Sequence, residues 1–377
     1  ALPDLIRENY KFREDIHVEY AGDIRPYLEQ KIWTEEESIK GLIINGRFQT
    51  VNDQFFVELE AYDIHNWQRL IKKQIFCPIH DIICLHDAFL MTVEKNISPF
   101  DANMAFDAGW NSIIPYTNVD MSELQTLVQD TIFSRSPSAL KRTGIFFGGR
   151  DTHVAMDMID EAKKSMIPPF EVSVFADPSG AFTTAAGMVA ITEKTLKDKF
   201  NKDLKGTKIV ILGGTGPVGI ASAVICAKAG ADVVIVGRNL EKTEKVSSIC
   251  NDRYGSKTVT AGEDSNKSEI LSNTDIVFNT AAAGIQLMDD ALVKSSKELK
   301  ICADVNAVPP SGIAGIDAMD DAVEMKNSSS GCLGIGALAI GNIKYKAQHD
   351  CLKLMCTADK PVYLHFEHAF KFAQKNI

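Results

Sequence analysis

The chain has 377 residues, which is enough for two or three domains at roughly 150 residues each. Hydrophobic residues make up 45% of it and charged residues 24%, the proportions of a soluble globular protein, which argues against disorder and against a fibrous structure. The net charge of −10 would repel phosphate backbones and anionic lipid, so we expect no nucleic-acid and no membrane partner. An anionic ligand would need a local positive site.

Targeting segments, cysteines and metal ligands give few signals. No run approaches the roughly 20 apolar residues of a membrane helix, and the first residues lack the apolar stretch of a signal peptide, so we expect a cytoplasmic protein. The eight cysteines are scattered without a CxxC pair, which predicts reduced, mostly buried thiols. His365 and His368 would share a helix face, but no third ligand follows at a readable spacing, so we favour a solvated face over a metal site and expect no metal.

The first 80 residues carry strand signals but no chemical motif. Strands are expected at Gly41–Phe48 and at about Gln54–Glu60. We assign residues 1–80 to an N-terminal extension of unknown role.

From residue 81 onward, strand signals alternate with helical ones, which predicts parallel βαβ units. The expected elements are an apolar run at Asp81–Leu85, a helix from Asp101, a strand at Thr143–Phe147, a helix at His153–Ser165, a strand at Phe170–Ala176 and a helix from Thr183. A lysine-rich polar connection at residues 197–206 is the expected domain boundary.

The segment after Lys208 has the pattern of a dinucleotide-binding fold. Further strands and helices are expected at Lys208–Leu212, Val218–Ala229, Gly230–Val236, Leu240–Asn251, Asp275–Phe278 and Lys300–Asp304. Gly214, Gly216 and Gly219 lie between the first strand and the first helix, where glycines permit a tight turn and close approach to a pyrophosphate. We therefore assign the loop to a dinucleotide, including Thr215, Pro217 and Val218; a plain glycine turn is the alternative.

Three further positions are candidate cofactor contacts. Arg238 follows the second strand, where an acidic residue usually selects NAD, and an arginine suits the 2′-phosphate of NADP. NADP is therefore favoured over NAD, although Arg238 could instead stack on adenine. Ala281 and Ala282 would let the backbone approach the cofactor or start a helix, and Asn306 follows a strand, where it binds a ligand or forms a turn.

Five ordered motifs give the chain a resemblance to a known family. They are residues 177–186, 214–219, 236–242, 303–317 and 333–346, with fainter likeness at 100–101, 107–110 and 116–119. Together they resemble the NADP-dependent methylene-tetrahydromethanopterin and methylene-tetrahydrofolate dehydrogenases of one-carbon metabolism. The likeness runs from about Ile82 to the C-terminus. Residues 1–80 have no counterpart, and Phe182 stands where the family tends to have Asn, so the pterin is not identified.

The resemblance implies an α/β enzyme with two domains and a pterin cleft between them. A substrate domain would comprise residues 81–197 and 343–377, because the C-terminal helices return to it, and a Rossmann-type NADP domain would comprise residues 198–342. The implied reaction moves a hydride from the methylene carbon of a tetrahydropterin to NADP and leaves a methenyl cation, without proton abstraction. We also expect a homo-oligomer.

The resemblance and the chemistry together suggest substrate contacts. Asp101 and Asp107 are the carboxylates expected near the pterin, although a helix cap or a solvated face explains either. Thr183 and Thr184 are expected to contact substrate or nicotinamide, with helix capping as the alternative.

Lys344 and Lys346 follow a glycine-rich turn, from which a cationic head could reach the pterin carbonyl or an anionic tail. Lys344 is the better candidate because it adjoins the turn; a solvated lysine at a helix start is the alternative. Two other functions stay open: an NADP-dependent dehydrogenase of another small substrate, shikimate-like or an amino acid, and a non-catalytic NADP-sensing module with residues 1–80 as its interaction arm.

Overall fold

The computed structural model describes residues 42–51, 54–63, 69–78 and 85–377. The chain divides into two compact units, Ala1–Cys84 and Leu85–Ile377.

The described part of the first unit is a three-stranded antiparallel sheet in chain order. Its strands are β1 (Leu42–Val51), β2 (Gln54–Asp63) and β3 (Arg69–Pro78). The two strands expected there are confirmed. β3 was not predicted, because Lys72-Lys73 and Ile75-Phe76 are pairs of like residues that interrupt the alternation of polar and apolar side chains. The apolar run expected at Asp81–Leu85 lies outside the described residues, apart from Leu85.

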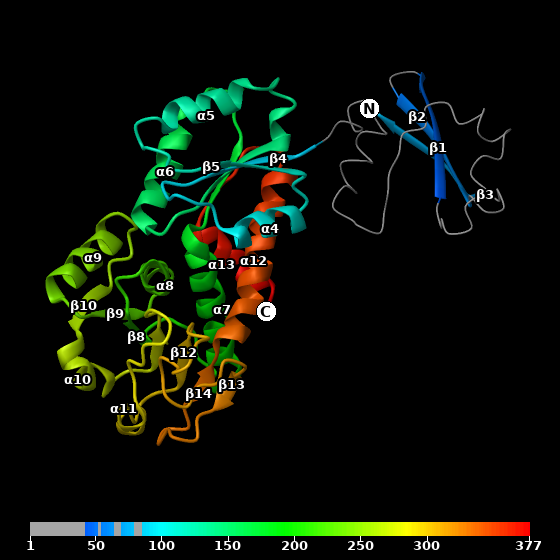
Figure 1. The fold of residues 1–377 in the computed structure, drawn as a ribbon. Helices are drawn as coiled ribbons and strands as arrows, with labels where there is room; N and C mark the ends of the chain where they lie inside the picture. Colours follow the sequence, from blue (N-terminus) through cyan, green and yellow to red (C-terminus); the bar gives the residue numbers. More distant parts are fainter. Residues whose placement is uncertain (1–41, 52–53, 64–68, 79–84) are drawn as a thin grey trace. The chain divides into compact units, whose positions relative to one another are not determined.

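The second unit begins with a five-stranded sheet in which every pair is parallel (Figure 1). In spatial order the strands are β15 (Tyr363–Leu364), β7 (Ser173–Ala176), β6 (Thr143–Phe147), β4 (Asp87–Met91) and β5 (Ser112–Tyr116). The central strand β6 is buried along its whole length, as a parallel strand covered on both faces should be.

Helices cover both faces of this sheet. Those described are α4 (Pro99–Asp107), α5 (Leu124–Phe133), α6 (Thr152–Ser165), α7 (Ala181–Phe200), α12 (Ala337–Thr357) and α13 (Phe366–Lys375). Ile145 and Phe147 of β6 join the apolar cluster of α5 and α6, whereas Phe146 joins that of α4 and α12. Successive side chains of one strand therefore anchor opposite helical layers.

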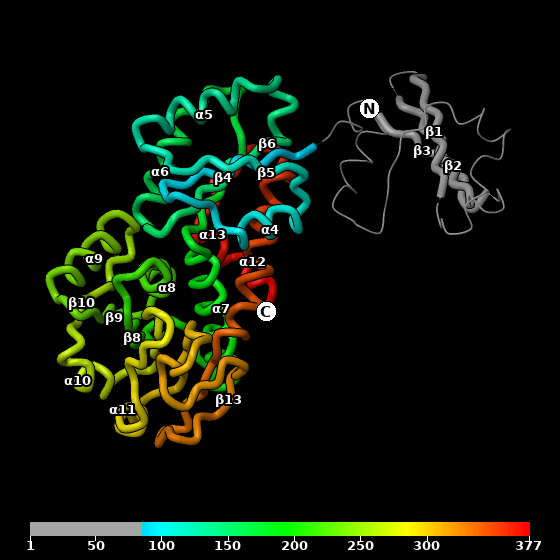
Figure 2. Tube along the Cα trace, viewed as in Figure 1, coloured from blue at the N-terminus to red at the C-terminus, as the bar shows by residue number. Residues whose placement is uncertain are grey.

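The C-terminal helices return to this sheet, as expected. Helix α12 lies beside α7 and α4 (Figure 2), and the buried Trp110 Nε1 donates to the carbonyl of Leu352 over 3.2 Å. A Cβ on Gly187 of α7 would lie 3.0 Å from Ile340 O and from Lys344 N, so only glycine lets the two helix backbones approach this closely. Helix α12 begins at Ala337, which is earlier than the Ile343 expected.

A seven-stranded sheet occupies the middle of the second unit. In spatial order its strands are β10 (Val259–Glu263), β9 (Asp232–Gly237), β8 (Lys208–Leu212), β11 (Ile276–Asn279), β12 (Ile301–Asp304), β14 (Leu333–Ile335) and β13 (Asp321–Glu324). All pairs are parallel except that of β13 with β14. The first six strands follow the Rossmann order 3-2-1-4-5-6, which confirms the predicted fold class.

Helices α8 (Pro217–Lys228), α9 (Leu240–Asp252), α10 (Lys267–Leu271) and α11 (Asp290–Ser295) connect these strands. The two sheets are joined where α7 packs against α8, and where Arg253 Nη2 contacts Asp157 Oδ1 of α6 over 2.7 Å.

The connection expected at residues 197–206 is partly helical. Helix α7 runs to Phe200, because Leu196 is buried while Lys197 and Lys199 lie exposed in the last turn, where basic side chains favour a helix end. Asn201 then ends the helix in the left-handed conformation, with φ 51°.

The fit around β6 can be tested with two glycine variants. A Cβ on Gly144 would lie 2.5 Å from Trp110 Cη2 and 2.8 Å from Met355 Cε, whereas one on Gly341 of α12 would meet no described atom within 4 Å. We expect Gly144→Ala to lower the free energy of unfolding by about 1–3 kcal/mol through overpacking. Gly341→Ala should raise it by about 0.5–1 kcal/mol, as alanine does inside a helix. Urea unfolding measures both; equal effects would contradict the packing described.

Candidate functional site

The glycine-rich loop after β8 packs closely on its surroundings at every glycine but one. A Cβ on Gly213, which has φ +71°, would lie 2.7 Å from Ala281 N, one on Gly214 would lie 2.7 Å from Ile235 Cβ, and one on Gly219 would lie 2.6 Å from Gly214 Cα. A Cβ on Gly216 would meet no described atom closer than Gly213 O at 3.5 Å. Gly216 is therefore the least crowded glycine of the loop, and an anionic group can approach its backbone.

The start of helix α8 suits such a group. Gly216 is the N-cap and Pro217 the first helical residue, and no side chain of the described residues caps this end. The first N–H groups and the positive end of the helix dipole are then available to a phosphate. Thr280, directly after β11, bonds to the end of β8 through Oγ1–Leu212 O at 3.0 Å, so the loops of β8 and β11 meet where the strand order reverses. Dinucleotides bind at this point in Rossmann sheets.

Arg238 directly follows β9 and is exposed. It forms no ion pair or hydrogen bond among residues 85–377, and a Cβ on the preceding Gly237 would lie 3.3 Å from Thr215 Cγ2. Arg238 thus has no partner among those residues, and the residue before it packs on the glycine-rich loop. Ala281 packs on that loop, while Ala282 is exposed beside it.

Asn306 has a structural role in its loop. Its Nδ2 donates to Pro310 O and its Oδ1 accepts from Val308 N, both over 2.9 Å, as in the turn-forming alternative. Sequence reasoning missed the neighbouring Asp304, which is buried and accepts from Asn279 Nδ2 over 2.7 Å and from Asn306 N over 2.9 Å. The hydrogen bonds of this carboxylate link the ends of β11 and β12. A cofactor contact by Asn306 stays a prediction.

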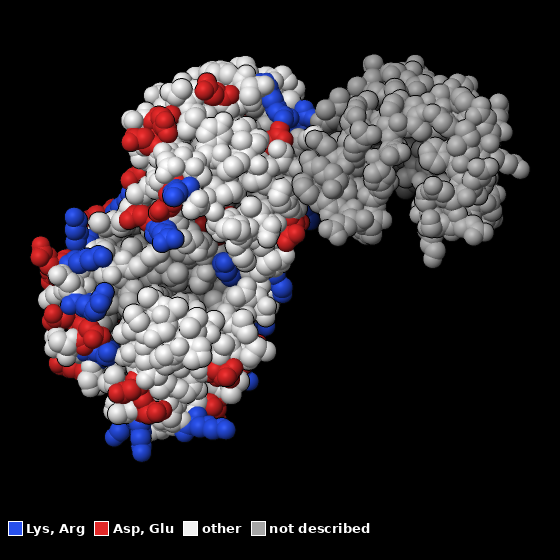
Figure 3. Space-filling model, in the orientation of Figure 1, with Lys and Arg blue, Asp and Glu red and all other residues white. Residues whose placement is uncertain are grey.

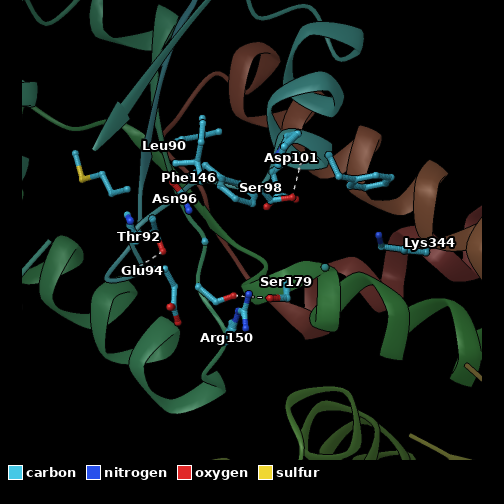
Figure 4. A pocket seen from close by; sticks show the side chains of 18 residues that line it. Leu90, Thr92, Glu94, Asn96, Ser98, Asp101, Phe146, Arg150, Ser179 and Lys344 are labelled. Atoms are coloured by element: carbon cyan, nitrogen blue, oxygen red, sulfur yellow. Dashed lines mark hydrogen bonds between the residues drawn. The ribbon is translucent and has the colours of Figure 1, made fainter. Parts of the chain in front are cut away.

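A second site is a cavity of about 550 Å³ at the carboxyl ends of β4 and β6 (Figure 4). Asp101 from α4, Arg150 from the loop after β6, Ser179 and Gly180 before α7, and Lys344 from α12 line it. Residues from the first and last parts of the second unit's sequence therefore line the same cavity.

Lys344 lies two turns inside helix α12 and not at a helix start, because Gly341 is itself helical. Its Nζ is 3.8 Å from the centroid of the Phe100 ring, a cation–π contact. A Cβ on Gly180, which has φ +65°, would lie 2.8 Å from Lys344 Cε and Nζ. Within residues 85–377 the ammonium has no ion-pair partner, so it is available to a ligand.

Asp101 is buried in the cavity wall, with 4% of its surface exposed. Gln348 Nε2 donates to its Oδ1 over 2.8 Å. Burial raises the pKa of this carboxyl to about 7, and the charge of Asp177 adds to the rise, whereas the Gln348 hydrogen bond and Lys344 oppose it. Near neutral pH the group is divided between its two protonation states.

Sequence reasoning also missed Asp177 as a site residue. It is fully buried, and its Oδ1 accepts from the N–H groups of Phe182 and Thr183 over 2.8 and 3.2 Å. Its Oδ2 accepts from Thr183 Oγ1 over 2.6 Å, while Thr184 Oγ1 donates to Gly180 O over 2.6 Å. Burial raises the pKa of Asp177 as well. Both threonine hydroxyls thus have partners within the protein, although neither caps the helix, and neither threonine lines the cavity. Their ligand contacts stay predictions.

The structure does not bring Asp107 to the cavity. Its Oδ2 accepts from Tyr345 Oη over 3.0 Å at an exposed hollow of about 230 Å³, which Lys346 also lines. Gln348, which sequence reasoning overlooked, does not itself line the cavity; it is buried behind Asp101, to which it donates, and lies only one helical turn after Lys344. This spacing of one helical turn from Lys344 was the sequence signal that could have identified Gln348.

The histidines of α13 do not form the solvated face expected. Both are partly buried, and His365 is the N-cap of α13, where it forms a capping box with His368. Burial and the neighbouring His368 lower the pKa of His365 to about 4. Within the described residues there is no group of three or more potential metal ligands, and no helix there is long and apolar enough to cross a bilayer.

The cavity and the glycine-rich loop are neighbours. Arg150 lines the cavity, and two residues later Thr152 Oγ1 lies 3.5 Å from Pro217 O at the start of α8. Figure 3 shows the surface hollowed between the two sheets of this unit, with Lys and Arg side chains around the hollow. A dinucleotide on the loop and a second ligand in the cavity would thus lie side by side.

Solved structures with similar folds include two dehydrogenases. Quinate dehydrogenase from Corynebacterium glutamicum, in complex with NAD, is 11% identical with a TM-score of 0.45, covering 76% of this chain and 98% of that one. Shikimate dehydrogenase from Mycobacterium tuberculosis is 15% identical with a TM-score of 0.42, covering 78% and 100%.

Sequence relatives are more similar. The sequence model described as "Methylene-tetrahydromethanopterin dehydrogenase, N-terminal" matches residues 99–179. The bifunctional protein MdtA of Methylorubrum extorquens is 34% identical over 290 residues, which are 76% of this chain and 97% of that protein. The NAD(P)-dependent methylenetetrahydromethanopterin dehydrogenase of the same organism is 43% identical over 287 residues, 75% of this chain and 96% of the relative. The chain therefore belongs to the methylene-tetrahydromethanopterin dehydrogenase family.

Proposed function

We propose that this chain is an NADP-dependent oxidoreductase that transfers a hydride between the methylene carbon of a methylene-tetrahydropterin and the nicotinamide, giving the methenyl form. The observation that carries the proposal is the adjacency of the Lys344 cavity and the glycine-rich loop, linked at Thr152 and Pro217. The pterin is tetrahydromethanopterin or tetrahydrofolate. Residues 81–197 and 343–377 would hold it, and residues 198–342 the dinucleotide.

The nicotinamide, when bound, supplies the carbon that accepts the hydride. The protein then has to orient two ligands and tolerate the positive charge that appears on the pterin ring. Lys344, held by Phe100 and free of other partners in the described chain, would donate to the pterin carbonyl or to an anionic tail. No group has to remove a proton from the reacting carbon.

The dinucleotide would lie across the switch point. The backbone at Gly216 and the start of α8 would hold the pyrophosphate, and Arg238 would pair with a 2′-phosphate. Our preference for NADP over NAD depends on this arginine. A cytoplasmic location and a homo-oligomeric state remain predictions.

The proposed reaction is tested by mixing the purified chain with NADP and either methylene-tetrahydromethanopterin or methylene-tetrahydrofolate. Formation of the methenyl chromophore together with NADPH is expected for at least one of them. Tight NADPH binding without turnover of either pterin would instead favour another substrate or a sensing role.

Replacing Arg238 should change cofactor choice. We expect Arg238→Ala to weaken NADP binding by about 1.5–3 kcal/mol, because a charge-assisted contact is lost, and to leave NAD binding nearly unchanged. Lys245→Ala, an exposed cation farther along α9, is the matched control. Calorimetric titration measures the affinity for each cofactor. Equal losses of affinity for NADP and NAD would show that Arg238 does not bind the 2′-phosphate.

Filling the space at Gly216 should block the dinucleotide. Gly216→Val is expected to abolish NADP binding while the melting temperature of the free protein stays close to wild type, since a side chain there meets no close described neighbour. Calorimetry and thermal melts separate the two effects. Normal NADP binding by a folded variant would show that the loop has been misassigned.

Lys344→Ala should lower catalytic efficiency toward the pterin about ten- to a hundredfold, because a charge-assisted hydrogen bond of about 1.5–3 kcal/mol is lost. NADP affinity should change by no more than about twofold, roughly 0.4 kcal/mol. Lys346→Ala is the comparison, since Lys346 is on the same helix but lines the other hollow. Steady-state kinetics at saturating NADP would exclude Lys344 from the site if both variants matched wild type.

A further inference from the structure

Asp101 and Gln348 form a pair whose hydrogen bonding is incomplete. Gln348 is fully buried, and only its Nε2 has a partner, Asp101 Oδ1 at 2.8 Å. Its Oε1 is buried without a hydrogen bond from any described residue. Buried amide oxygens usually have a donor, so this arrangement needs a reason.

An amide is a neutral side chain that can serve a carboxyl group in both protonation states. Its NH₂ donates to an ionised carboxylate, and after a half-turn about its last bond its oxygen accepts from a protonated one. Gln348 can therefore keep a hydrogen bond to Asp101 whether or not Asp101 carries a proton. A lysine or a backbone N–H at the same place would suit only the ion.

The other buried carboxylate is held differently. Asp177 accepts from two backbone N–H groups and from the hydroxyl of Thr183, and backbone donors cannot turn into acceptors. Two fixed backbone donors therefore favour the ionised form of Asp177, whereas the side-chain partner of Asp101 can reverse its role.

Charged groups face Asp101 from several elements. Asp177 before α7 and Lys344 of α12 act on it most directly, and Glu94, Lys95 and Arg150 line the rest of the cavity. Burial and Asp177 together raise the pKa of Asp101 to about 7, so a modest change of charge in the cavity shifts its protonation at physiological pH.

We propose that Asp101, with Gln348 as its positioning residue, releases a proton when the cavity takes up a cationic methenyl-tetrahydropterin, so that the charge of the cavity follows that of the ring. This inference rests on the proposed function. The hydride leaves the methylene carbon with its electron pair and reduces the nicotinamide, which leaves one positive charge on the pterin. The O–H bond of Asp101 breaks, the proton passes to solvent through the cavity opening, and the negative charge that remains offsets the new positive one.

The affinity for the methenyl cation should then depend on pH. Below the pKa of free Asp101 the binding constant should rise about tenfold per pH unit, because binding releases a proton, and above it the constant should level off. Binding of the neutral methylene form should lack this dependence.

The experiment counts protons released on binding. The full-length protein is titrated with methenyl-tetrahydrofolate or methenyl-tetrahydromethanopterin, whichever it turns over, at pH 6 in two buffers with different ionisation enthalpies. Wild type should release close to one proton, on the order of 0.9. Asp101→Asn should release almost none and show a flat affinity profile from pH 5.5 to 7.5. Asp130→Asn, an exposed carboxylate on α5, should behave as wild type.

Gln348→Met tests the positioning role, and also serves if Asp101→Asn does not fold. Without the amide donor the ionised form of Asp101 is less stable. The affinity for the methenyl cation should therefore level off at a higher pH, while proton release persists. Cation binding by wild type without proton release, unchanged release in Asp101→Asn, or an unmoved profile in Gln348→Met would overturn the proposal while leaving the dehydrogenase function intact. Absence of both turnover and methenyl binding would reject the two together.

Discussion

The close packing of α12 on α7 is the constraint on which the site depends. Gly187 allows the backbone of α7 to approach Ile340 O and Lys344 N, and Gly180 leaves room for the lysine side chain itself. This contact places Lys344 and Gln348, from the C-terminal part of the chain, at the ends of strands formed much earlier in the sequence. Without it, the cavity would lack Lys344, and Asp101 would lack the hydrogen bond from Gln348.

The electrostatic arrangement follows from that packing. Asp101 and Lys344 face the same cavity, Asp177 is buried close to Asp101, and burial raises the pKa of both acids. A hydride transfer that creates a cation needs negative charge nearby, but a bare carboxylate is costly in a site without its ligand. A carboxyl that titrates near neutral pH satisfies both requirements, because it is partly protonated in the empty site and fully ionised only when the cation is bound.

The sequence predicts the regular elements well and the site only in part. The strand at Thr143–Phe147, the glycine-rich loop and the helix after Arg238 were identified because their signals are local: a buried run, a spacing of glycines, a period of 3.6. β14 was not predicted because it is only three residues long.

Residues whose roles arise from distant contacts were harder to identify. Asp177 and Gln348 contribute through burial and through partners far away in the sequence, which no local pattern reveals. Asp107 was expected near the pterin together with Asp101, but the two carboxylates line different hollows on α4. The glycines before Lys344 suggested a bend, whereas Gly336 is the N-cap of α12 and Gly341 lies inside that continuous helix.

The most direct test of the account follows the transferred hydrogen. The protein is given NADP and a methylene-tetrahydropterin in which both hydrogens of the bridging carbon are deuterium. The reduced cofactor is then analysed by mass spectrometry. Each molecule of NADPH formed should carry one deuterium, because the hydride passes directly from that carbon to the nicotinamide. NADPH formed without deuterium would contradict direct transfer between the two neighbouring sites.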